Sequence, residues 1–211
     1  MPDAQPSTLG RLVAVRPAAA HPHLIAAPVA AALAAWLEAA EVAVAEIDPA
    51  VADTAALVAA YGVPAEVSAN CVVVAGRRDG QERVAACVVL ATTRADVNGL
   101  VRRLLDVRKA SFLSTDRAVA DTGMEYGGIT PVGLPAEWRL LVDAGAAALP
   151  LAVIGSGVRR SKLVLAGALL GKLPNAEVIE GLGLPVEPAP RALLISEGGA
   201  PTARLRRPPP R

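Results

Sequence analysis

A short run of glycine and proline is the part of the chain best suited to bind a reacting group. The run GGITPVGLP, from Gly127 to Pro135, holds three glycines and two prolines in nine residues, so it cannot form the interior of a helix or regular strand. Glycine lets backbone N–H groups approach a ligand closely, and proline fixes the shape of the loop. Such a loop can hold a carbonyl oxygen or an oxyanion without a charged side chain. A structural corner between two strands is the alternative for the loop alone.

Other residue types give weaker signals for catalysis. Ser156 lies in Gly-Ser-Gly but lacks the residues of a nucleophile elbow, and His21 and His23 lie in a segment rich in proline and alanine. Cys71 and Cys87 have no histidine nearby in sequence to activate a thiolate, so we interpret them as small buried hydrophobic residues. The spacing of these cysteines and histidines matches no zinc site, and the loop matches neither GxxxxGK[ST] nor GxGxxG. We therefore expect no metal and no cofactor.

The composition restricts the class of protein. The 211 residues carry 21 Lys and Arg against 20 Asp and Glu, a formal charge of +1, which excludes a strongly acidic or basic protein. Mean hydropathy is +0.42, but the apolar run Leu24 to Leu37 is shorter than the roughly 20 residues that cross a bilayer, and the N-terminus has no signal-peptide pattern. Aromatic residues make up 2%, which disfavours stacking platforms for single-stranded nucleic acid. We expect a cytoplasmic protein with no membrane or DNA partner.

Hydrophobic periodicity switches repeatedly between helical and strand patterns, which predicts one mixed domain around the glycine loop. The apolar core must come from Val, Leu, Ile and Ala because aromatic residues are scarce. The expected elements are helix 27–40, strand 41–48, helix 54–61, strands 71–76 and 83–91, helix 93–105, strand 109–113, helix 115–123, strands 139–143, 149–156 and 158–167, and a short helix 168–173.

The segment from residue 70 to 90 gives the strongest local prediction. Two runs rich in β-branched residues flank the Asp79-Gly80 dipeptide, which favours a two-residue type I′ turn and a β-hairpin. With these two residues in the loop, the register places Cys71 and Cys87 on opposite faces of the hairpin.

Residues 121–135, DTGMEYGGITPVGLP, resemble the glycine loop of the YbaK/EbsC family, free-standing relatives of the editing domain inserted in bacterial prolyl-tRNA synthetase. The GxxxP signature of this family falls on Gly127 and Pro131. The order of helix, hairpin and helix before the loop, and the segment LAVIGSGVRRSKLVL after it, are similar to the family as well, over residues 27–183.

The resemblance implies an α+β fold: a single domain with a curved, barrel-like mixed sheet flanked by helices. We expect this editing domain at residues 25–183, after an N-terminal extension at 1–24. Residues 184–211, rich in proline and arginine, are expected to form a flexible tail.

The resemblance also implies an activity, the trans-editing hydrolysis of mischarged aminoacyl-tRNA of the Cys, Ala or Ser type. The partner would be the 3′ end of aminoacyl-tRNA, with an aminoacyl-tRNA synthetase as a further candidate partner. Backbone amides of Gly127 and Gly128 would bind the ester carbonyl, and Asn70 and Thr130 would contact the terminal adenosine or the amino-acid head. The remaining residues expected to bind substrate are Ile129, Pro131, Gly133, Ser156, Gly157 and Lys162.

Two positions depart from the family pattern. Family deacylases carry a lysine where this chain has Asn70, and a neutral amide cannot supply the positive charge of an ammonium. Many also carry an acidic residue near the position of Lys162. In this chain Lys162, together with Arg159 and Arg160, is a candidate to supply from the other side the positive charge that Asn70 lacks. Two alternatives therefore stay open: a non-catalytic module of this fold that binds a tRNA end or a small ligand, and a purely structural protein. A Gly128→Val substitution is expected to abolish binding or hydrolysis while sparing the fold.

Overall fold

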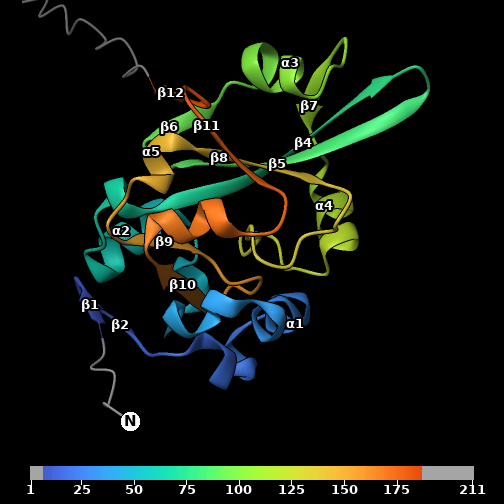
Figure 1. Cartoon of the computed structure of the whole chain (residues 1–211). Helices are drawn as coiled ribbons and strands as arrows, with labels where there is room; N and C mark the ends of the chain where they lie inside the picture. Colours follow the sequence, from blue (N-terminus) through green and yellow to red (C-terminus); the bar gives the residue numbers. More distant parts are fainter. Residues whose placement is uncertain (1–6, 187–211) are drawn as a thin grey trace, which may run out of the picture.

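The computed structural model describes residues 7–186, and a five-stranded mixed sheet lies at its centre (Figure 1). Strands β4, β5 and β7 pair antiparallel, whereas β8 is parallel to β5 and β11 is parallel to β8. Valine and alanine dominate β4 and β5, and both faces of their middle segments are buried. In spatial order the strands are β11 (Ala176–Ile179), β8 (Arg139–Asp143), β5 (Gln81–Leu90), β4 (Ala69–Arg78) and β7 (Ala110–Phe112).

A second, antiparallel sheet of three strands joins distant parts of the chain: β3 (Ala43–Glu46), β10 (Ser161–Leu165) and β9 (Ala152–Gly155). Two small sheets pair β1 (Ser7–Leu9) with β2 (Leu12–Ala14), and β12 (Gly183–Pro185) with β6 (Thr93–Ala95). The mixed α+β fold is thus confirmed. A barrel-like sheet is not, because a single bridge between Ser68 and Val153 links the two larger sheets and the described strands form no closed ladder.

The helices are short, and α1 (Ala27–Ala35) and α3 (Arg102–Leu104) pack against faces of the sheets in two separate hydrophobic clusters (Figure 1). Two of them end as expected at a glycine in the left-handed region, Gly62 (φ 68°) and Gly123 (φ 65°), where a residue without Cβ is favoured. The other helices are α2 (Thr54–Tyr61), α4 (Thr115–Thr122) and α5 (Ala144–Ala147).

Two expected helices differ from the prediction. Helix 27–40 stops at Ala35 because Trp36 is extended, and Leu37–Glu41 forms a separate 3₁₀ helix. In the expected helix 93–105, Thr93 instead belongs to β6, and Asp96 caps a π-helical segment by accepting the N–H groups of Gly99 and Leu100 at 2.9 and 2.7 Å. The pairing of β6 with β12 is long-range, so local periodicity could not reveal it.

The predicted hairpin is confirmed. Arg78 pairs with Gln81, and Asp79 and Gly80 both have positive φ, as a type I′ turn requires. Cys71 packs against the core cluster that contains α1, whereas Cys87 belongs to the cluster beneath α3. The two thiols therefore lie on opposite faces of the hairpin.

The first and last described segments each form part of a small two-stranded sheet. Leu12 and Ala14 of β2 are buried in a cluster with β3 and α2, and Leu184 pairs with Arg94 in the small sheet of β12 and β6. Residues 1–6 and most of the expected tail, residues 187–211, lie outside the described residues. No helix in the described part of the chain combines the length and apolar character needed to cross a membrane.

Candidate functional site

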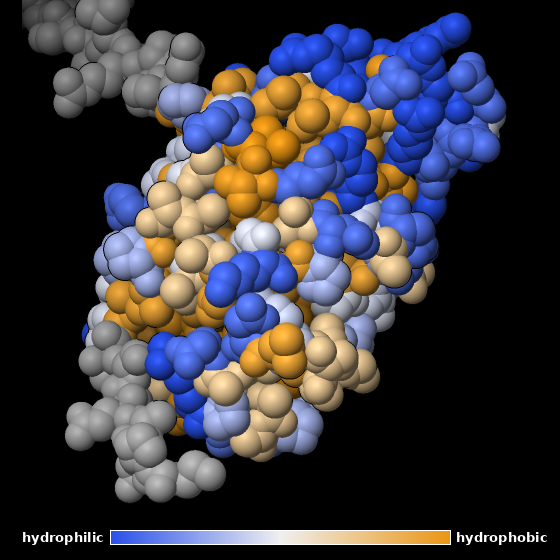
Figure 2. All heavy atoms as spheres, in the orientation of Figure 1, coloured by the Kyte–Doolittle hydropathy of each residue, from blue (hydrophilic) through white to orange (hydrophobic). Residues whose placement is uncertain are grey.

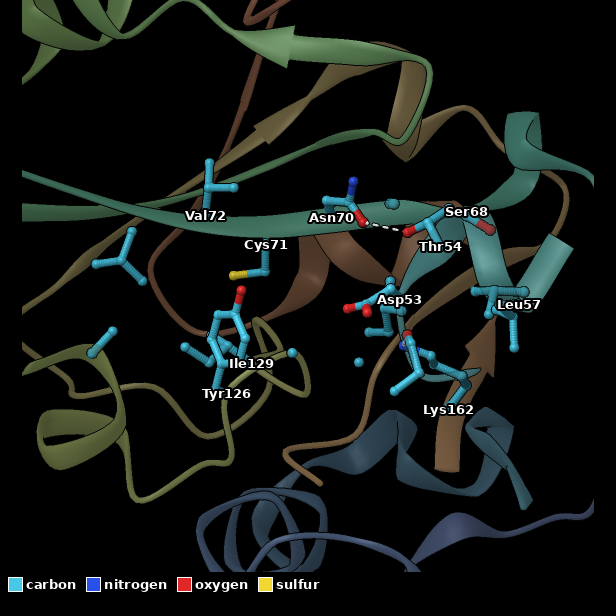
Figure 3. A pocket seen from close by; sticks show the side chains of 18 of the residues that line it. Asp53, Thr54, Leu57, Ser68, Asn70, Cys71, Val72, Tyr126, Ile129 and Lys162 are labelled. Atoms are coloured by element: carbon cyan, nitrogen blue, oxygen red, sulfur yellow. Dashed lines mark hydrogen bonds between the residues drawn. The ribbon is translucent and has the colours of Figure 1, made fainter. Parts of the chain in front are cut away.

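A pocket of about 420 Å³ lies where the glycine loop meets both larger sheets (Figure 3). Its walls come from the start of α2, the first half of β4, the end of β7, the loop after α4, and the facing ends of β9 and β10. This volume is within the usual range for small-molecule sites. The residues of the glycine loop that line it are Gly127 and Ile129, and Tyr126 lies beside them.

Gly127 presents its backbone to this pocket. Its φ is +77°, and none of the described residues accepts a hydrogen bond from its N–H. Gly128 is different: it is buried, its N–H donates to the Glu125 carbonyl at 2.9 Å, and its carbonyl accepts the Gly157 N–H at 2.8 Å. The Gly127 N–H is therefore available to a ligand, as is that of Ile129, whereas Gly128 fastens the loop to the segment after β9.

Several other predicted site residues support the loop and do not line the pocket. Gly157 (φ 83°) packs so closely on α1 that an added Cβ would lie 2.4 Å from Ala26 Cβ. Ser156 is fully buried, and its hydroxyl lies 3.1 and 3.0 Å from the carbonyls of Val158 and Ser161. Both residues hold the turn against which the glycine loop rests.

The remaining part of the loop faces away from the pocket. Pro131 and Gly133 line a separate cavity beside Trp36 and Trp138. Thr130 is completely buried, and its hydroxyl has no hydrogen-bond partner among residues 7–186. Of the predicted site residues, the structure therefore brings Gly127, Ile129, Asn70 and Lys162 together at the pocket. The predicted residues that do not line it are Gly128, Thr130, Pro131, Gly133, Ser156 and Gly157.

Asn70 lies at the exposed rim of the pocket, near the start of β4. Its amide oxygen accepts a hydrogen bond from the Thr54 hydroxyl at 3.0 Å (Figure 3). This contact ties the first turn of α2 to β4. It also fixes the orientation of the amide, so that the carboxamide N–H₂ group is left to donate outward.

Lys162 is the buried cation of the site. Only 8% of the residue is exposed, and its ammonium donates to the Ala52 carbonyl at 2.7 Å. Burial lowers the pKa of this lysine; the Asp53 carboxylate opposes that shift, whereas the Arg159 guanidinium adds to it. Its position on β10, opposite Gly155 of β9, directs the side chain toward the turn before α2.

Asp53 is a site residue that the sequence did not reveal. It is the N-cap residue of α2, yet its side chain caps no backbone N–H. Its carboxylate extends into the pocket in Figure 3 and lies 3.9 Å from the Arg159 guanidinium. Asp53 and Thr54 are adjacent at the expected helix start, and both are residue types that commonly cap a helix. Because one cap is enough, this pair is the sequence signal that one of the two side chains is free for another role.

The Arg159 side chain bridges the segment before α2 and the loop after α4, beside the pocket. Its guanidinium donates to the carbonyls of Pro49 and Tyr126 at 3.2 and 3.4 Å, and its backbone N–H donates to the Glu125 carboxylate at 2.7 Å. An added Cβ on Gly127 would lie 2.5 Å from the same guanidinium. The arginine therefore holds the glycine loop next to Asp53.

Cys71 also lines the pocket, but its thiol is unsuited to attack an ester. Burial, with a smaller contribution from Cys87, raises the pKa of the Cys71 thiol far above its usual range. The thiolate is the nucleophilic form, so this cysteine stays a neutral, apolar part of the wall.

These features define a class of α+β domain in which a glycine loop, a carboxylate and a buried lysine line one small pocket. The chain belongs to the aminoacyl-tRNA editing domain family, whose model matches residues 48–173. The matched region contains every pocket residue described above. The resemblance to the YbaK/EbsC family is thereby confirmed.

Solved structures share the fold at low sequence identity. A scaffold protein from computational epitope grafting is 20% identical, with a TM-score of 0.62, over 82% of this chain and 100% of the other. A candidate trans-editing enzyme for prolyl-tRNA synthetase is 20% identical, with a TM-score of 0.60, over 73% and 96%. A hypothetical protein is 22% identical, with a TM-score of 0.55, over 63% and 85%. Among curated proteins, none matches this chain.

Proposed function

We propose that this protein is a trans-editing deacylase that hydrolyses the ester of mischarged aminoacyl-tRNA. The observation that carries the proposal is that Gly127, whose N–H has no acceptor among the described residues, lines the same small pocket as Asp53 and Lys162. A backbone donor placed in a partly enclosed site stabilises the oxyanion that forms when a carbonyl is attacked, and one such donor contributes about 100-fold or more to a rate.

The reaction needs only water and the ester. Water adds to the carbonyl carbon, the bond from that carbon to the ribose oxygen breaks, and the products are the free amino acid and tRNA with a free terminal hydroxyl. In this proposal the Gly127 N–H binds the carbonyl oxygen, and positioning of the ester supplies the rest of the catalysis. The neutral Cys71 thiol takes no part as a nucleophile.

Asp53 fits the α-ammonium of the aminoacyl group. A carboxylate that accepts a hydrogen bond from an ammonium makes a charge-assisted contact, stronger than a neutral one. The Lys162 ammonium holds the carbonyl of the preceding residue, Ala52, at 2.7 Å. We therefore regard Lys162 as a positioning residue, which fixes the turn that carries Asp53.

The lining of the pocket supports small amino acids as substrates. Ala52, Ala69 and Cys71 form part of its wall. Ser68 lies in the same wall, is 3% exposed, and has a hydroxyl with no partner in the described part of the chain. An unpartnered buried hydroxyl favours a ligand that brings a hydroxyl or thiol to it, so seryl and cysteinyl esters are favoured over alanyl ones.

A second candidate is a non-catalytic module that binds the tRNA end or a small ligand. Asn70 favours it, because the neutral amide at the rim already accepts the Thr54 hydroxyl and adds no positive charge there. The two candidates share the pocket and differ only in whether the ester is cleaved.

The test is incubation of the purified protein with seryl-, cysteinyl- and alanyl-tRNA made on non-cognate tRNAs, with release of the amino acid followed over time. The matched binding measurement uses the same tRNAs with the ester replaced by an amide at the terminal ribose. Release faster than spontaneous hydrolysis is expected for at least one ester. Binding of the amide-linked tRNAs with no accelerated release would contradict the deacylase and favour the binding module.

A further inference from the structure

A groove next to the pocket carries an excess of positive charge. It has a volume of about 470 Å³ and follows β4, β7 and the start of α4. We call it the basic groove, because four cationic side chains line it against one carboxylate. Its charged lining residues are Arg77, Arg108, Lys109 and Arg117, with Glu82 as the single acid.

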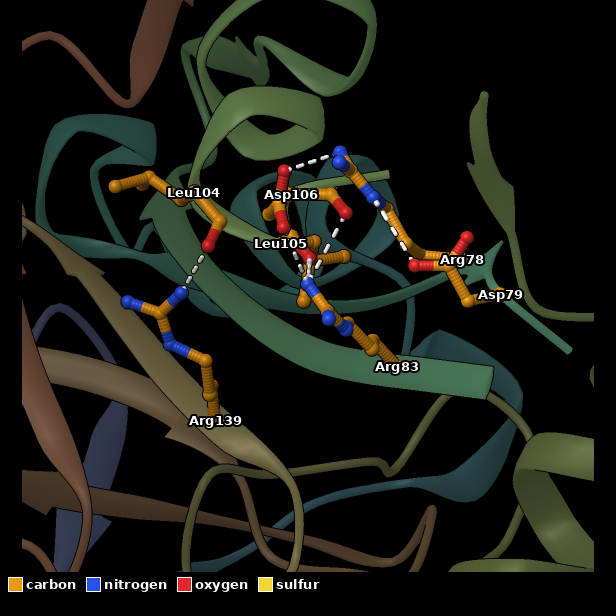
Figure 4. A network of polar contacts seen from close by, with 7 residues as sticks. All are labelled: Arg78, Asp79, Arg83, Leu104, Leu105, Asp106 and Arg139. Carbon is orange, nitrogen blue, oxygen red and sulfur yellow. Dashed lines mark hydrogen bonds and ion pairs between the residues drawn. The ribbon is translucent and has the colours of Figure 1, made fainter. Parts of the chain in front are cut away.

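Most other arginines at this end of the hairpin are neutralised by acidic neighbours. Arg78 and Arg83 both contact the Asp106 carboxylate, at 2.6 and 3.0 Å (Figure 4). In the basic groove itself, Arg117 binds Glu82 at 2.6 Å. The groove cations with no carboxylate at ion-pair distance among residues 7–186 are Arg77, Arg108 and Lys109.

The three cations without an ion pair in the described part of the chain lie at the surface. All are exposed, and Figure 2 shows strongly hydrophilic residues gathered over the end of the hairpin, at the upper right. Arg77 faces Glu82 across the hairpin register, but Glu82 already receives two hydrogen bonds from Arg117, at 2.8 and 2.6 Å. The groove therefore offers uncompensated positive charge along a continuous surface.

An exposed aromatic ring lies where the basic groove meets the pocket. Phe112 is the only phenylalanine in the chain and is 62% exposed at the end of β7. Together with Leu113 it lines both the pocket and the groove. The scarcity of aromatic residues disfavours an extended stacking platform. Phe112 can still stack on one base, because it is exposed between the pocket and the groove. An exposed apolar ring between a ligand pocket and a cationic surface suits the π-face of a base.

We propose that the basic groove binds the single-stranded 3′ end of tRNA, with a base stacked on Phe112 and phosphates on Arg77, Arg108 and Lys109. The inference rests on the proposed function, because it places the aminoacyl group in the pocket and leads the polynucleotide out past Phe112. Exposed cations on a groove contact phosphates without reading sequence, and the stacking ring accepts any base.

The first test measures binding of an RNA hairpin that ends in single-stranded CCA and carries no amino acid, over a range of salt concentrations. The double variant R108Q/K109Q is expected to bind about tenfold more weakly at low salt, with the slope of log affinity against log salt reduced by about two. The matched control is R16Q/R94Q, which removes the same charge from exposed residues outside both the pocket and the groove. Equal losses in the two double variants would overturn the groove assignment.

The second test concerns the ring. Phe112→Leu keeps an apolar side chain but removes the π-face, and is expected to weaken binding of the same RNA about tenfold. Phe112→Tyr keeps the ring and is expected to bind like the wild type. Because Phe112 is exposed, both variants are expected to fold normally. An equal affinity for Leu and Tyr variants would overturn the stacking contact.

A third measurement separates this inference from the proposed function. The substrate is a 3′-O-aminoacyl adenosine, which carries the ester but no phosphate. R108Q/K109Q is expected to cleave it at the wild-type rate. If the wild-type protein cleaves this ester but R108Q/K109Q binds the RNA as tightly as the wild type does, the groove is refuted and the deacylase stands. RNA binding through the groove with no cleavage of any ester would refute the deacylase and leave the groove standing.

Discussion

The Lys162 ammonium donates a hydrogen bond to the Ala52 carbonyl at 2.7 Å, and both residues are almost completely buried. This contact joins β10 to the turn before α2, two segments 110 residues apart in sequence. Because Asp53 follows Ala52, the buried ammonium sets the position of the one carboxylate that lines the pocket within residues 7–186.

The first prediction concerns stability against pH. Burial lowers the pKa of Lys162 in the folded state, whereas the unfolded chain keeps an ordinary lysine pKa of about 10.4. As pH rises through the folded pKa toward that value, the unfolded state binds more protons, so the free energy of unfolding increases. Lys162→Met is expected to lack this increase. Urea denaturation between neutral and alkaline pH checks it, with Lys172→Met, at a lysine whose side chain is 57% exposed, as control. Parallel profiles for wild type and Lys162→Met would contradict it.

The second prediction concerns substrate choice at Ser68. If its unpartnered hydroxyl receives the substrate's hydroxyl, Ser68→Ala should slow release from seryl-tRNA about tenfold and leave alanyl-tRNA nearly unchanged. The measurement is the ratio of kcat/KM for the two esters. Removal of an unsatisfied group costs the fold little, so a uniform loss for both esters would refute a role in selectivity.

The third prediction concerns Asp53. The Asp53 side chain makes no capping hydrogen bond and is 68% exposed, and its ion pair with Arg159 is long at 3.9 Å, so Asp53→Asn is expected to change the free energy of unfolding by less than about 1 kcal/mol. Loss of a charge-assisted contact to the α-ammonium should lower kcat/KM about 10- to 100-fold. An N-acetylated aminoacyl ester, which has no ammonium, serves as control and should show the same rate with both proteins. Full activity of the variant on the free-amine ester would exclude this role.

Local patterns predicted the elements better than they predicted the site. The Asp79-Gly80 turn, and through it the faces of the two cysteines, follow from neighbouring residues alone. The glycine loop was also evident from composition. What it does depends on contacts that composition cannot show: the Gly128 N–H is used by the Glu125 carbonyl and the Gly128 carbonyl by the Gly157 N–H, whereas the N–H groups of Gly127 and Ile129 have no acceptor among the described residues.

The contributions of Asp53 and Lys162 could not be seen in the sequence for the same reason. Asp53 directly precedes the expected start of a helix at Thr54, and the structure makes it the N-cap residue of α2 with a carboxylate that caps no N–H group of the helix. Lys162 was expected at the site, but its burial and its contact with Ala52 arise only when β10 packs beside the turn before α2. Local periodicity carries no information about which distant segments meet.

The fourth prediction corrects the expectation that Gly128→Val spares the fold. An added Cβ at Gly128 would lie 2.8 Å from backbone atoms of Val158, which cannot move aside, so even Gly128→Ala is expected to destabilise the protein by about 2 kcal/mol or more. At Gly127 the nearest atom belongs to the flexible Arg159 side chain, and Gly127→Ala should cost only about 1 kcal/mol for the positive φ. Thermal denaturation of the two alanine variants compares them directly. Equal melting temperatures would show that the packing around Gly128 is not rigid.

The last prediction concerns the rim residue Asn70. The family resemblance implies a lysine at this position, and the structure places Asn70 at the exposed edge of the pocket, where an ammonium loses little hydration. If the pocket holds an aminoacyl ester of a terminal nucleotide, Asn70→Lys should raise kcat/KM severalfold, because an ammonium attracts a phosphate more strongly than a carboxamide does. Asn70→Met is the matched control, since it also removes the acceptor of the Thr54 hydroxyl but adds no charge. A gain in the lysine variant alone assigns the effect to charge, and the gain should shrink as salt is raised. If lysine and methionine lower the rate equally, the Asn70–Thr54 hydrogen bond is what the pocket requires, and a ligand that does not depend on phosphate charge becomes the better description.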